Sequence, residues 1–338
     1  MNWQSLPPIF LYPMLIPHVF KLCIKYKTSI SIITKSNPAF PYGGLPFASK
    51  KDIFDIFKNK NEFLPYELIK YNIELEQKIQ ISKDFISKVS YPIIAKPDTS
   101  HRGIDVNLIN NENELVELLK NQKWDYILQE YCDYNHEFGV FYSRLPKEKK
   151  GSIISLSSKK IPIILGNGKD NLKTLILNAE IDNKKNILAK FEKKLDFILP
   201  QGESLKTLVC ASHAQGAIFS DAKDFITQNL IDKTDEICNV EGFYFGRLDV
   251  RSKSFEALKE GDFRIIEING ATSEFIHIYD KNYSFKEGLS ELKRQWNLLF
   301  EISNENRNIK SNNLSFFEFI KEYVRFFLLT KKVTGRLW

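Results

Sequence analysis

The sequence has no long apolar run and no clustered cysteines. No stretch of about 18 apolar residues is free of charge, so a transmembrane helix is not expected. The four cysteines lie far apart and form no CxxC pair, which argues against a disulfide framework and against a cysteine metal site. The apolar segment that begins at Leu6 is broken by four prolines and has no basic stretch before it, unlike a signal peptide. We therefore expect a cytoplasmic protein.

Repeats and low-complexity tracts are also absent. Apolar residues make up 43% and charged residues 27% of the 338 residues, as in an ordinary globular chain, so disorder and a fibrous repeat are excluded. This length suits one large domain or two to three modules, since domains usually run to about 100–200 residues. No pattern of Ser/His/Asp or Cys/His residues indicates a covalent nucleophile.

The net charge of +6 is concentrated at the two ends of the chain. Residues 1–30 carry +3 and residues 305–338 carry +4, which leaves −1 for the 274 residues between them. A nucleic-acid enzyme more often carries its positive charge along a central groove, so we expect no nucleic-acid partner.

The order of the predicted elements indicates an α/β (α+β) chain with at least two modules. The least regular part is 1–85, with a β run at Ser29–Ile33, a loop at Asn37–Gly44, and helices at Lys51–Lys58 and Glu76–Val89. Strands are expected at Ile93–Lys96, Ile104–Leu108, Tyr126–Glu130, Glu137–Ser143, Ser152–Ser158, Phe243–Val250 and Phe263–Ile268. Helices are expected from Asn111, around Leu172–Leu199, and at Asp221–Cys238, Phe285–Ile302 and Leu314–Leu329. We divide the chain into an N-terminal region (1–85), two α+β subdomains (86–150 and 151–282) and C-terminal helices (283–338).

The strongest candidate site lies on the last two strands. Side chains alternate along a strand, so Arg247, Asp249 and Arg251 share one face, as do Glu267 and Asn269 on the other strand. If the strands pair, two carboxylates and an amide oxygen converge, the hard-oxygen ligands that Mg²⁺ prefers. A surface ladder of ion pairs is the alternative. It explains poorly why an acid and an asparagine end an otherwise apolar strand.

A second candidate site follows the strand that ends at Lys96. This lysine precedes a polar loop that contains Gly103, a place from which it could neutralise a phosphate. A solvated lysine at the end of a strand is the alternative. Downstream, an apolar strand ends at Glu130 and Glu137 follows, and a strand-end carboxylate of this kind can accept hydrogen bonds from ribose hydroxyls.

These features follow one another along the chain as a strand lysine, a loop, an acidic hinge, and the RLD and EIN strands. In this order the chain resembles the ATP-grasp superfamily, and within it the D-alanine–D-alanine ligase-like branch. The resemblance covers about Tyr91–Asp280. The resemblance implies two α+β subdomains that enclose ATP, with one or two Mg²⁺ ions that Mn²⁺ can replace. Its implied ATP-binding residues are Lys96, Thr99, Ser100, His101, Arg102, Gly103, Gln129, Glu130, Tyr131 and Glu137. Its implied metal ligands are Asp249, Glu267 and Asn269, and its implied catalytic residues are Arg247 and Lys96.

The chain also departs from that branch. The loop TSHRG holds one glycine where the ligases have several, and GATSEFIH follows Asn269 in place of the segment that receives D-alanine. The stretches NPAFPYGG, SLSSKK and NGATSEFIHIYD look more like a group of predicted carboxylate–amine ligases. The resemblance thus implies an ATP-dependent ligase that joins a small-molecule or lipid-linked carboxylate to an amine through an acyl phosphate. Candidate substrate contacts are His213, Lys160, Arg251, Ser273 and His277, although structural roles for the two histidines and a solvated position for Lys160 stay open.

Two other functions are compatible with these motifs. A kinase on the same fold would pass the phosphoryl group to a hydroxyl, and a non-catalytic, membrane-associated module would only bind nucleotide. The final helix carries an aromatic stripe that either packs on the body or binds an anionic membrane, together with residues 1–30. We therefore expect a cytoplasmic enzyme that can associate peripherally with the inner face of the membrane through residues 1–30 and 305–338. Whether the chain forms a homodimer stays open.

Overall fold

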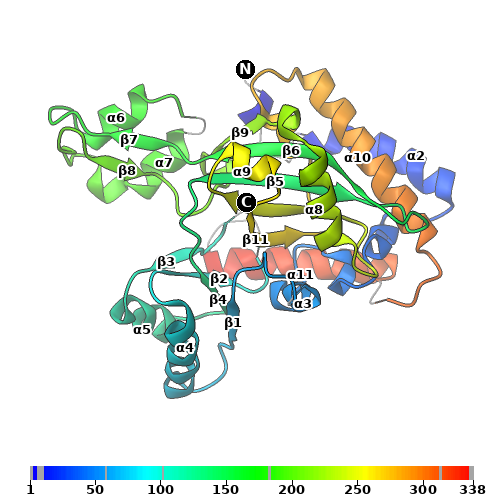
Figure 1. Ribbon diagram of the computed structural model, residues 1–338, viewed down its shortest axis with the longest axis horizontal. Coiled ribbons are helices and arrows are strands. Elements are labelled where there is room, and N and C mark those ends of the chain that lie inside the picture. Colours follow the sequence, from blue (N-terminus) through cyan, green and yellow to red (C-terminus); the bar gives the residue numbers. More distant parts are fainter. Residues whose placement is uncertain are drawn as a thin grey trace.

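Two antiparallel β-sheets, joined by helices, form the body of the protein (Figure 1). The computed structural model describes residues 3–5, 11–57, 59–100, 103–181, 184–311 and 314–334. The α/β class predicted from the sequence is confirmed. The two sheets face one cavity, which is the arrangement that the ATP-grasp resemblance implies.

The first sheet has four strands in the order β1–β4–β2–β3. Its strands are β1 (Tyr66–Ile69), β2 (Ile93–Pro97), β3 (Asn107–Ile109) and β4 (Tyr126–Glu130). Helices α4 (Leu75–Val89) and α5 (Glu112–Lys120) pack on it through a core that includes Phe85 and Leu115. The side chain of Asn111 accepts a hydrogen bond from the Glu114 amide and fixes the start of α5, as its position before two acidic residues predicts.

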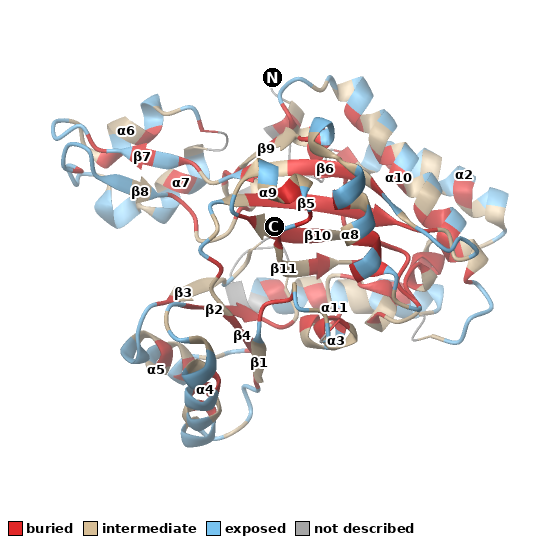
Figure 2. Ribbon diagram, viewed as in Figure 1, coloured by how far each residue is buried: buried red, intermediate tan, exposed pale blue. Residues whose placement is uncertain are grey.

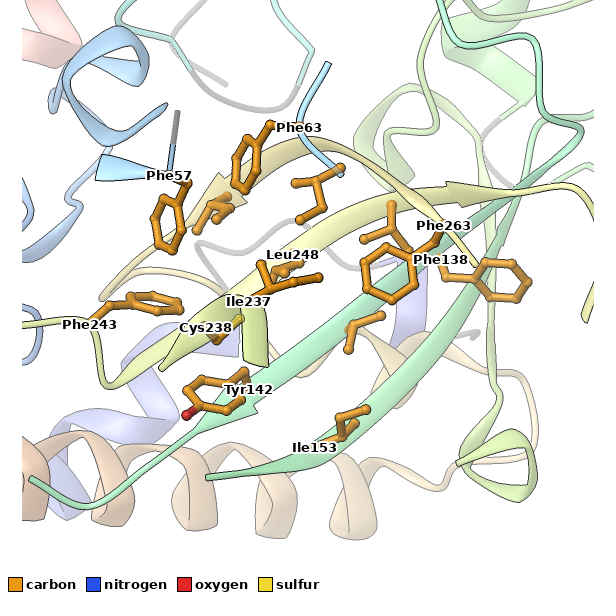
Figure 3. Packing of buried hydrophobic residues seen from close by; sticks show 14 of the residues in the cluster. Phe57, Phe63, Phe138, Tyr142, Ile153, Ile237, Cys238, Phe243, Leu248 and Phe263 are labelled. Atoms are coloured by element: carbon orange, nitrogen blue, oxygen red, sulfur yellow. The ribbon is translucent and has the colours of Figure 1, made fainter. Parts of the chain in front are cut away.

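The second sheet has five strands in the order β11–β10–β5–β6–β9. Its strands are β5 (His136–Ser143), β6 (Ser152–Lys160), β9 (Ile218–Asp221), β10 (Phe245–Ser252) and β11 (Arg264–Asn269). One face is apolar and is covered by α3 (Lys50–Ile56), α8 (Gln228–Cys238) and α9 (Phe255–Lys259). Figure 3 shows Phe138, Tyr142 and Leu248 of this face packed with Ile237 and Cys238 of α8. The polar side chains of β10 and β11 are thereby turned to the opposite face, toward the cavity.

The terminal segments pack on that opposite face, beyond the polar residues. They comprise η1 (Trp3–Ser5), η2 (Tyr12–Leu15), α2 (Ile16–Tyr26), η3 (Ile30–Lys35), η4 (Pro41–Gly43), α10 (Phe285–Glu305) and α11 (Phe316–Thr334). Their core joins Phe141 and Phe245 of the sheet to Leu292 and Phe300 of α10. A capping box at Ser284 begins α10.

A small third lobe projects from the second sheet (Figure 1). It consists of β7 (Ile163–Leu165), α6 (Leu172–Asn178), α7 (Lys184–Lys190), η5 (Glu192–Lys194) and β8 (Ser204–Lys206). The lobe has its own apolar core around Ile176 and Ile187. The short helices η6 (His213–Gln215) and η7 (Lys223–Phe225) flank β9, and η8 (Ile276–Tyr279) lies between β11 and α10.

Two of the sequence-based assignments are wrong. Ser29–Ile33 is not a strand, because this segment turns as η3 and the Thr34 hydroxyl donates to the Ser31 carbonyl. The helix expected from Asp221 begins only at Gln228, capped by Thr227, because Ile218–Asp221 pairs with β6. The subdomain boundaries stay predictions, although the strand order places β1 with the first sheet and β5 with the second.

The aromatic stripe of α11 divides between two environments. Phe319 and Phe326 are buried against the body, whereas Phe317 and Val324 are exposed at 82% and 52%. Figure 2 shows both buried and exposed stretches along α11. In the described part of the chain, no helix combines the length and the apolar character needed to cross a bilayer.

Candidate functional site

A cavity of about 940 Å³ lies between the two sheets. Both sheets line it, through Lys96 and Gln129 on one side and Asp249 and Glu267 on the other. The terminal helices line a further part of it, which includes Trp296. Ligand sites in proteins usually span about 300–1,000 Å³, so this cavity is large enough for more than one substrate.

The register of β10 and β11 brings the predicted metal ligands together. Asp249 pairs directly with Glu267, and Arg247 pairs with Asn269. Val250 then pairs with Ile265, so Ile266 is an extra residue that forms a bulge. A bulge residue is left out of the ladder. Its carbonyl oxygen instead accepts a hydrogen bond of 2.9 Å from Lys96 Nζ, which ties the first sheet to the second.

Asp249 is a buried carboxylate that remains ionised. Arg247 Nε donates to its Oδ1 at 2.8 Å, and Lys159 Nζ lies 2.9 Å from the same oxygen. Burial opposes ionisation, but these two cations outweigh it and lower the pKa of Asp249 to about 2. The ladder of ion pairs considered from the sequence is therefore present, yet it faces the cavity rather than bulk solvent.

The ligand set suits a hard cation that also binds phosphate. No three His, Cys, Asp or Glu side chains of the described residues gather as a metal-binding group. Asp249 and Glu267 would supply two carboxylates and Asn269 an amide oxygen, a set that leaves coordination positions open. Mg²⁺ is commonly held by one or two carboxylates together with substrate phosphates and water, so the residues present fit this ion.

Lys96 is buried on the cavity wall between the two sheets. Its Nζ donates to Gln129 Oε1 and to the Ile266 carbonyl, both at 2.9 Å. Burial lowers the pKa of Lys96 to about 8, although Glu267 acts in the opposite direction. The alternative of a solvated lysine at a strand end is thus wrong, because this side chain is enclosed.

Two buried polar atoms of the cavity have no hydrogen-bond partner among the described residues. They are the donor Gln129 Nε2 and the acceptor Glu137 Oε2, although this oxygen has an ion pair with Arg251 Nη2 at 3.5 Å. Leaving a buried donor such as Gln129 Nε2 unsatisfied costs about 1–3 kcal/mol. A ligand that offers both acceptors and donors would satisfy them. The hinge residues Glu130 and Tyr131 also line the cavity, and the Arg251 guanidinium lies 5.5 Å from the centre of the Tyr131 ring.

The loop after Lys96 meets the second subdomain across the cavity. Gly103 has a φ of +72°, and a Cβ there would lie 2.5 Å from Cys210 Sγ. Gln215 Nε2 donates to the Gly103 carbonyl at 2.9 Å. Burial raises the pKa of the Cys210 thiol to about 12, so this cysteine is a packing residue and not a nucleophile. Ser100 and Gly103 line the cavity, whereas the predicted His101 and Arg102 lie outside the described residues.

The segment after β11 forms the far end of the polar region. Ser273 and Glu274 line the cavity, and Arg247 donates to the Glu274 carbonyl at 3.2 Å. The Glu274 carboxylate accepts hydrogen bonds from the hydroxyls of Tyr12 and Tyr279. His213 also lines the cavity, with its ring stacked 4.4 Å from that of Tyr279.

Three predicted residues do not line the cavity in the described part of the chain: Thr99, Lys160 and His277. His277 is buried and bonded to Ser155 at 2.7 Å, which supports its structural role. Lys160 is exposed because alternation along β6 turns it away and turns Lys159 inward.

Sequence reasoning missed Lys50, Lys159 and Glu274. Lys159 could have been found by continuing the alternation along β6 to its end. Lys50 donates to the Ser100 carbonyl at 2.7 Å and lies 3.7 Å from Glu267, contacts that no local pattern indicates. Glu274 stands in the NGATSEF stretch, but its partner Tyr12 is 262 residues away.

Comparisons with known proteins give only distant similarities. A scan against family models and a search of curated proteins find no match. Among solved structures, a D-alanine–D-alanine ligase from Bacillus anthracis is similar over 79% of this chain and 70% of its own, with 12% identity and a TM-score of 0.46. A bifunctional glutathione synthetase from Pasteurella multocida is similar over 76% of this chain and 36% of its own, with 12% identity and a TM-score of 0.39. A VanG D-Ala:D-Ser ligase from Enterococcus faecalis is similar over 75% of this chain and 62% of its own, with 13% identity and a TM-score of 0.42. At these values no activity or residue role is carried over to this chain.

Proposed function

We propose that the chain is an ATP-dependent ligase that activates a carboxylate as an acyl phosphate and joins it to an amine. The observation that supports this most is the pairing of the Asp249 and Glu267 carboxylates, set on adjacent strands among four cationic side chains. These cations are Lys50, Lys96, Lys159 and Arg247, and all four line the one cavity. Two anions surrounded by cations suit a metal-bound polyphosphate, since each charge of the ligand would meet one of the opposite sign.

ATP would bind across the two sheets. The hinge Gln129–Tyr131 would meet the adenine. The Oε2 oxygen of Glu137, which has an ion pair with Arg251 but no hydrogen bond, would accept from a ribose hydroxyl. Lys96 and Lys159 would then lie beside the phosphates. The loop that carries Ser100 and Gly103 would cover them, held toward the second subdomain by Gln215.

A magnesium ion held by Asp249, Glu267 and Asn269 would neutralise and orient the phosphates. Arg247 is fixed by Asp249 on one side and by the Glu274 carbonyl on the other, so its guanidinium is held in place before any substrate binds. In this position it would stabilise the anion that develops when a carboxylate oxygen attacks the terminal phosphorus. The amine would next form the amide bond as phosphate leaves, and its proton would pass to a nearby base.

The test measures ADP release with pooled carboxylates and amines, with and without hydroxylamine. We expect ADP release that requires a carboxylate, and a hydroxamate that traps the acyl phosphate. Asp249→Asn should reduce turnover at least a hundredfold. The control Asp262→Asn removes a carboxylate that is 56% exposed and should have no effect.

Three results would contradict the proposal. Phosphorylation of a hydroxyl without hydroxamate would identify a kinase instead. ATP binding without turnover on any pool, unchanged in Asp249→Asn, would identify a non-catalytic module. Absence of ATP binding would remove the basis of all three functions.

We also propose that α2 binds an anionic membrane surface peripherally. Phe20 and Ile24 are 65% and 63% exposed one turn apart, and Lys21 and Lys25 lie beside them. An apolar stripe flanked by lysines complements an anionic bilayer. Vesicle flotation should recover the wild type but not Phe20→Glu/Ile24→Glu. Equal recovery of the two proteins would contradict the membrane contact.

A further inference from the structure

The cavity continues beyond the polar residues into an apolar limb. This limb is lined by side chains of the terminal segments, chiefly Leu45, Leu292, Trp296, Phe319, Tyr323 and Phe326. Among the described residues, every charged side chain on the cavity wall lies between 50 and 274, so the parts contributed by α2, α10 and α11 carry none. The cavity therefore has a charged end at the sheets and an uncharged end at the terminal helices.

The limb connects the reacting groups to the surface. Glu274 lines the same cavity as the limb, and its carboxylate accepts a hydrogen bond from the hydroxyl of Tyr12 in η2. Ile16, at the start of α2, lines the same cavity and is 64% exposed. An elongated ligand could thus extend from Glu274 toward the protein surface at α2.

The chemistry of the wall indicates what such a ligand would be. An apolar void deprives its lining atoms of dispersion contacts, and such voids in proteins bind hydrocarbon rather than water. Gln295, a polar residue of the wall, already donates to the Ser273 carbonyl and accepts from the Phe275 amide. A hydrocarbon chain fits this limb better than a sugar or a peptide, which would need polar partners.

The head of the ligand would meet Glu274. This carboxylate already accepts from two phenol hydroxyls, and an ammonium group could donate to its remaining lone pairs. A carboxylate head would instead be repelled there. The Glu274 carboxylate therefore favours an amine over a carboxylate at this point of the cavity wall.

We propose that the acceptor is an amphiphilic primary amine, with its nitrogen at Glu274 and its hydrocarbon chain in the apolar limb. This inference rests on the proposed ligase function and names the class of its second substrate. In the reaction, Glu274 would take a proton from the ammonium group, and the free amine would attack the acyl carbon. The new C–N bond forms as the C–O bond to phosphate breaks, phosphate leaves with the electron pair, and the second proton of the nitrogen passes to that phosphate.

The limb can be probed without turnover, because Trp296 lies in its wall. The probe is 12-bromododecylamine, used below its micellar concentration and without nucleotide, since bromine quenches indole fluorescence on contact. We expect saturable quenching of the fluorescence in the wild type. In Trp296→Phe this quenching should be lost, and the fluorescence that remains includes that of Trp124 in the core of the first sheet. Each methylene buried should raise affinity about fourfold, so the C8, C10 and C12 amines should differ by about 15-fold per step of two carbons.

Paired variants distinguish the limb from nonspecific binding. Ile30→Glu places a charge in the limb and should weaken dodecylamine binding at least tenfold. Ile163→Glu places the same charge on an exposed residue of the third lobe and should not. Dodecanoate should bind at least tenfold more weakly than dodecylamine. Glu274→Gln should remove this preference for the amine, while its melting temperature stays equal to that of the wild type.

Several outcomes would overturn the inference. They are quenching that survives in Ile30→Glu, affinity independent of chain length, and tighter binding of dodecanoate. These results leave the ligase proposal intact if ATP binding and hydroxamate formation are observed. Conversely, amine binding without ATP binding would support the limb and contradict the ligase.

Discussion

Replacing Lys159 by Met should damage both stability and nucleotide binding, whereas the same change at Lys160 should affect neither. The Lys159 side chain is 3% exposed, and its Nζ lies 2.9 Å from Asp249 Oδ1 and 3.2 Å from Glu137 Oε1. Lys160, the next residue on β6, is exposed on the other face. The two substitutions are chemically identical, so any difference between them reports position alone.

The magnitude follows from the burial of the charge cluster. Removing one partner of a buried ion pair costs about 3–5 kcal/mol, because the remaining charge stays desolvated. An unfolding entropy of about 2.1 cal/mol/K per residue gives about 0.7 kcal/mol/K for the chain. The melting temperature of Lys159→Met should therefore fall by about 4–7 °C. Loss of one charge-assisted hydrogen bond to phosphate, about 1.5–3 kcal/mol, should raise the Kd for ATP about 10- to 150-fold.

The measurements are thermal unfolding and calorimetric titration with ATP and Mg²⁺ for the two variants and the wild type. Equal melting temperatures for the two variants would refute the assignment of Lys159 to the buried cluster. A lower melting temperature with unchanged ATP affinity would refute its contact with phosphate and leave only its packing role.

Three further predictions concern the same cavity. Asp249 has its pKa lowered to about 2 in the folded protein, so its stabilisation of about 2 kcal/mol is complete above pH 4 and lost toward pH 2. Urea unfolding across this range should show that loss in the wild type and not in Asp249→Asn. The pKa of Lys96 is lowered to about 8, so as pH rises the folded state releases this proton before the unfolded state does. The free energy of unfolding should therefore rise from pH 8 to 10.5 in the wild type relative to Lys96→Met. ATP affinity should fall over the same range, and both quantities are measured at a series of pH values. Gly103→Ala should weaken ATP binding because the added Cβ would collide with Cys210. Gly202→Ala is the control, since its φ is also positive but its Cβ would enter open space. The control should cost only backbone strain of about 1–2 kcal/mol in the free energy of unfolding.

Local patterns in the sequence were enough to find most of the charged residues that line the cavity. Period-two alternation placed Arg247, Asp249 and Arg251 on one face, and the register of β10 and β11 confirms that Glu267 lies opposite Asp249. Such patterns succeed where one face of a strand is apolar and the other polar, because the core fixes which face is which. They failed at Ser29–Ile33, where a short β-branched run forms η3 and packs against α10 instead of joining a sheet.

The sequence by itself determined the α/β class, the charged strand pair and the basic ends of the chain, because each is written in neighbouring residues. Only the tertiary structure decided which lysines serve the cavity. It selected Lys159 over Lys160 by the direction of one strand, and it brought Lys50 within 3.7 Å of Glu267 across more than 200 residues. It also placed the terminal helices around the cavity, where their apolar side chains form the limb. Contacts between distant segments depend on how the sheets and helices pack, and no local pattern encodes that packing.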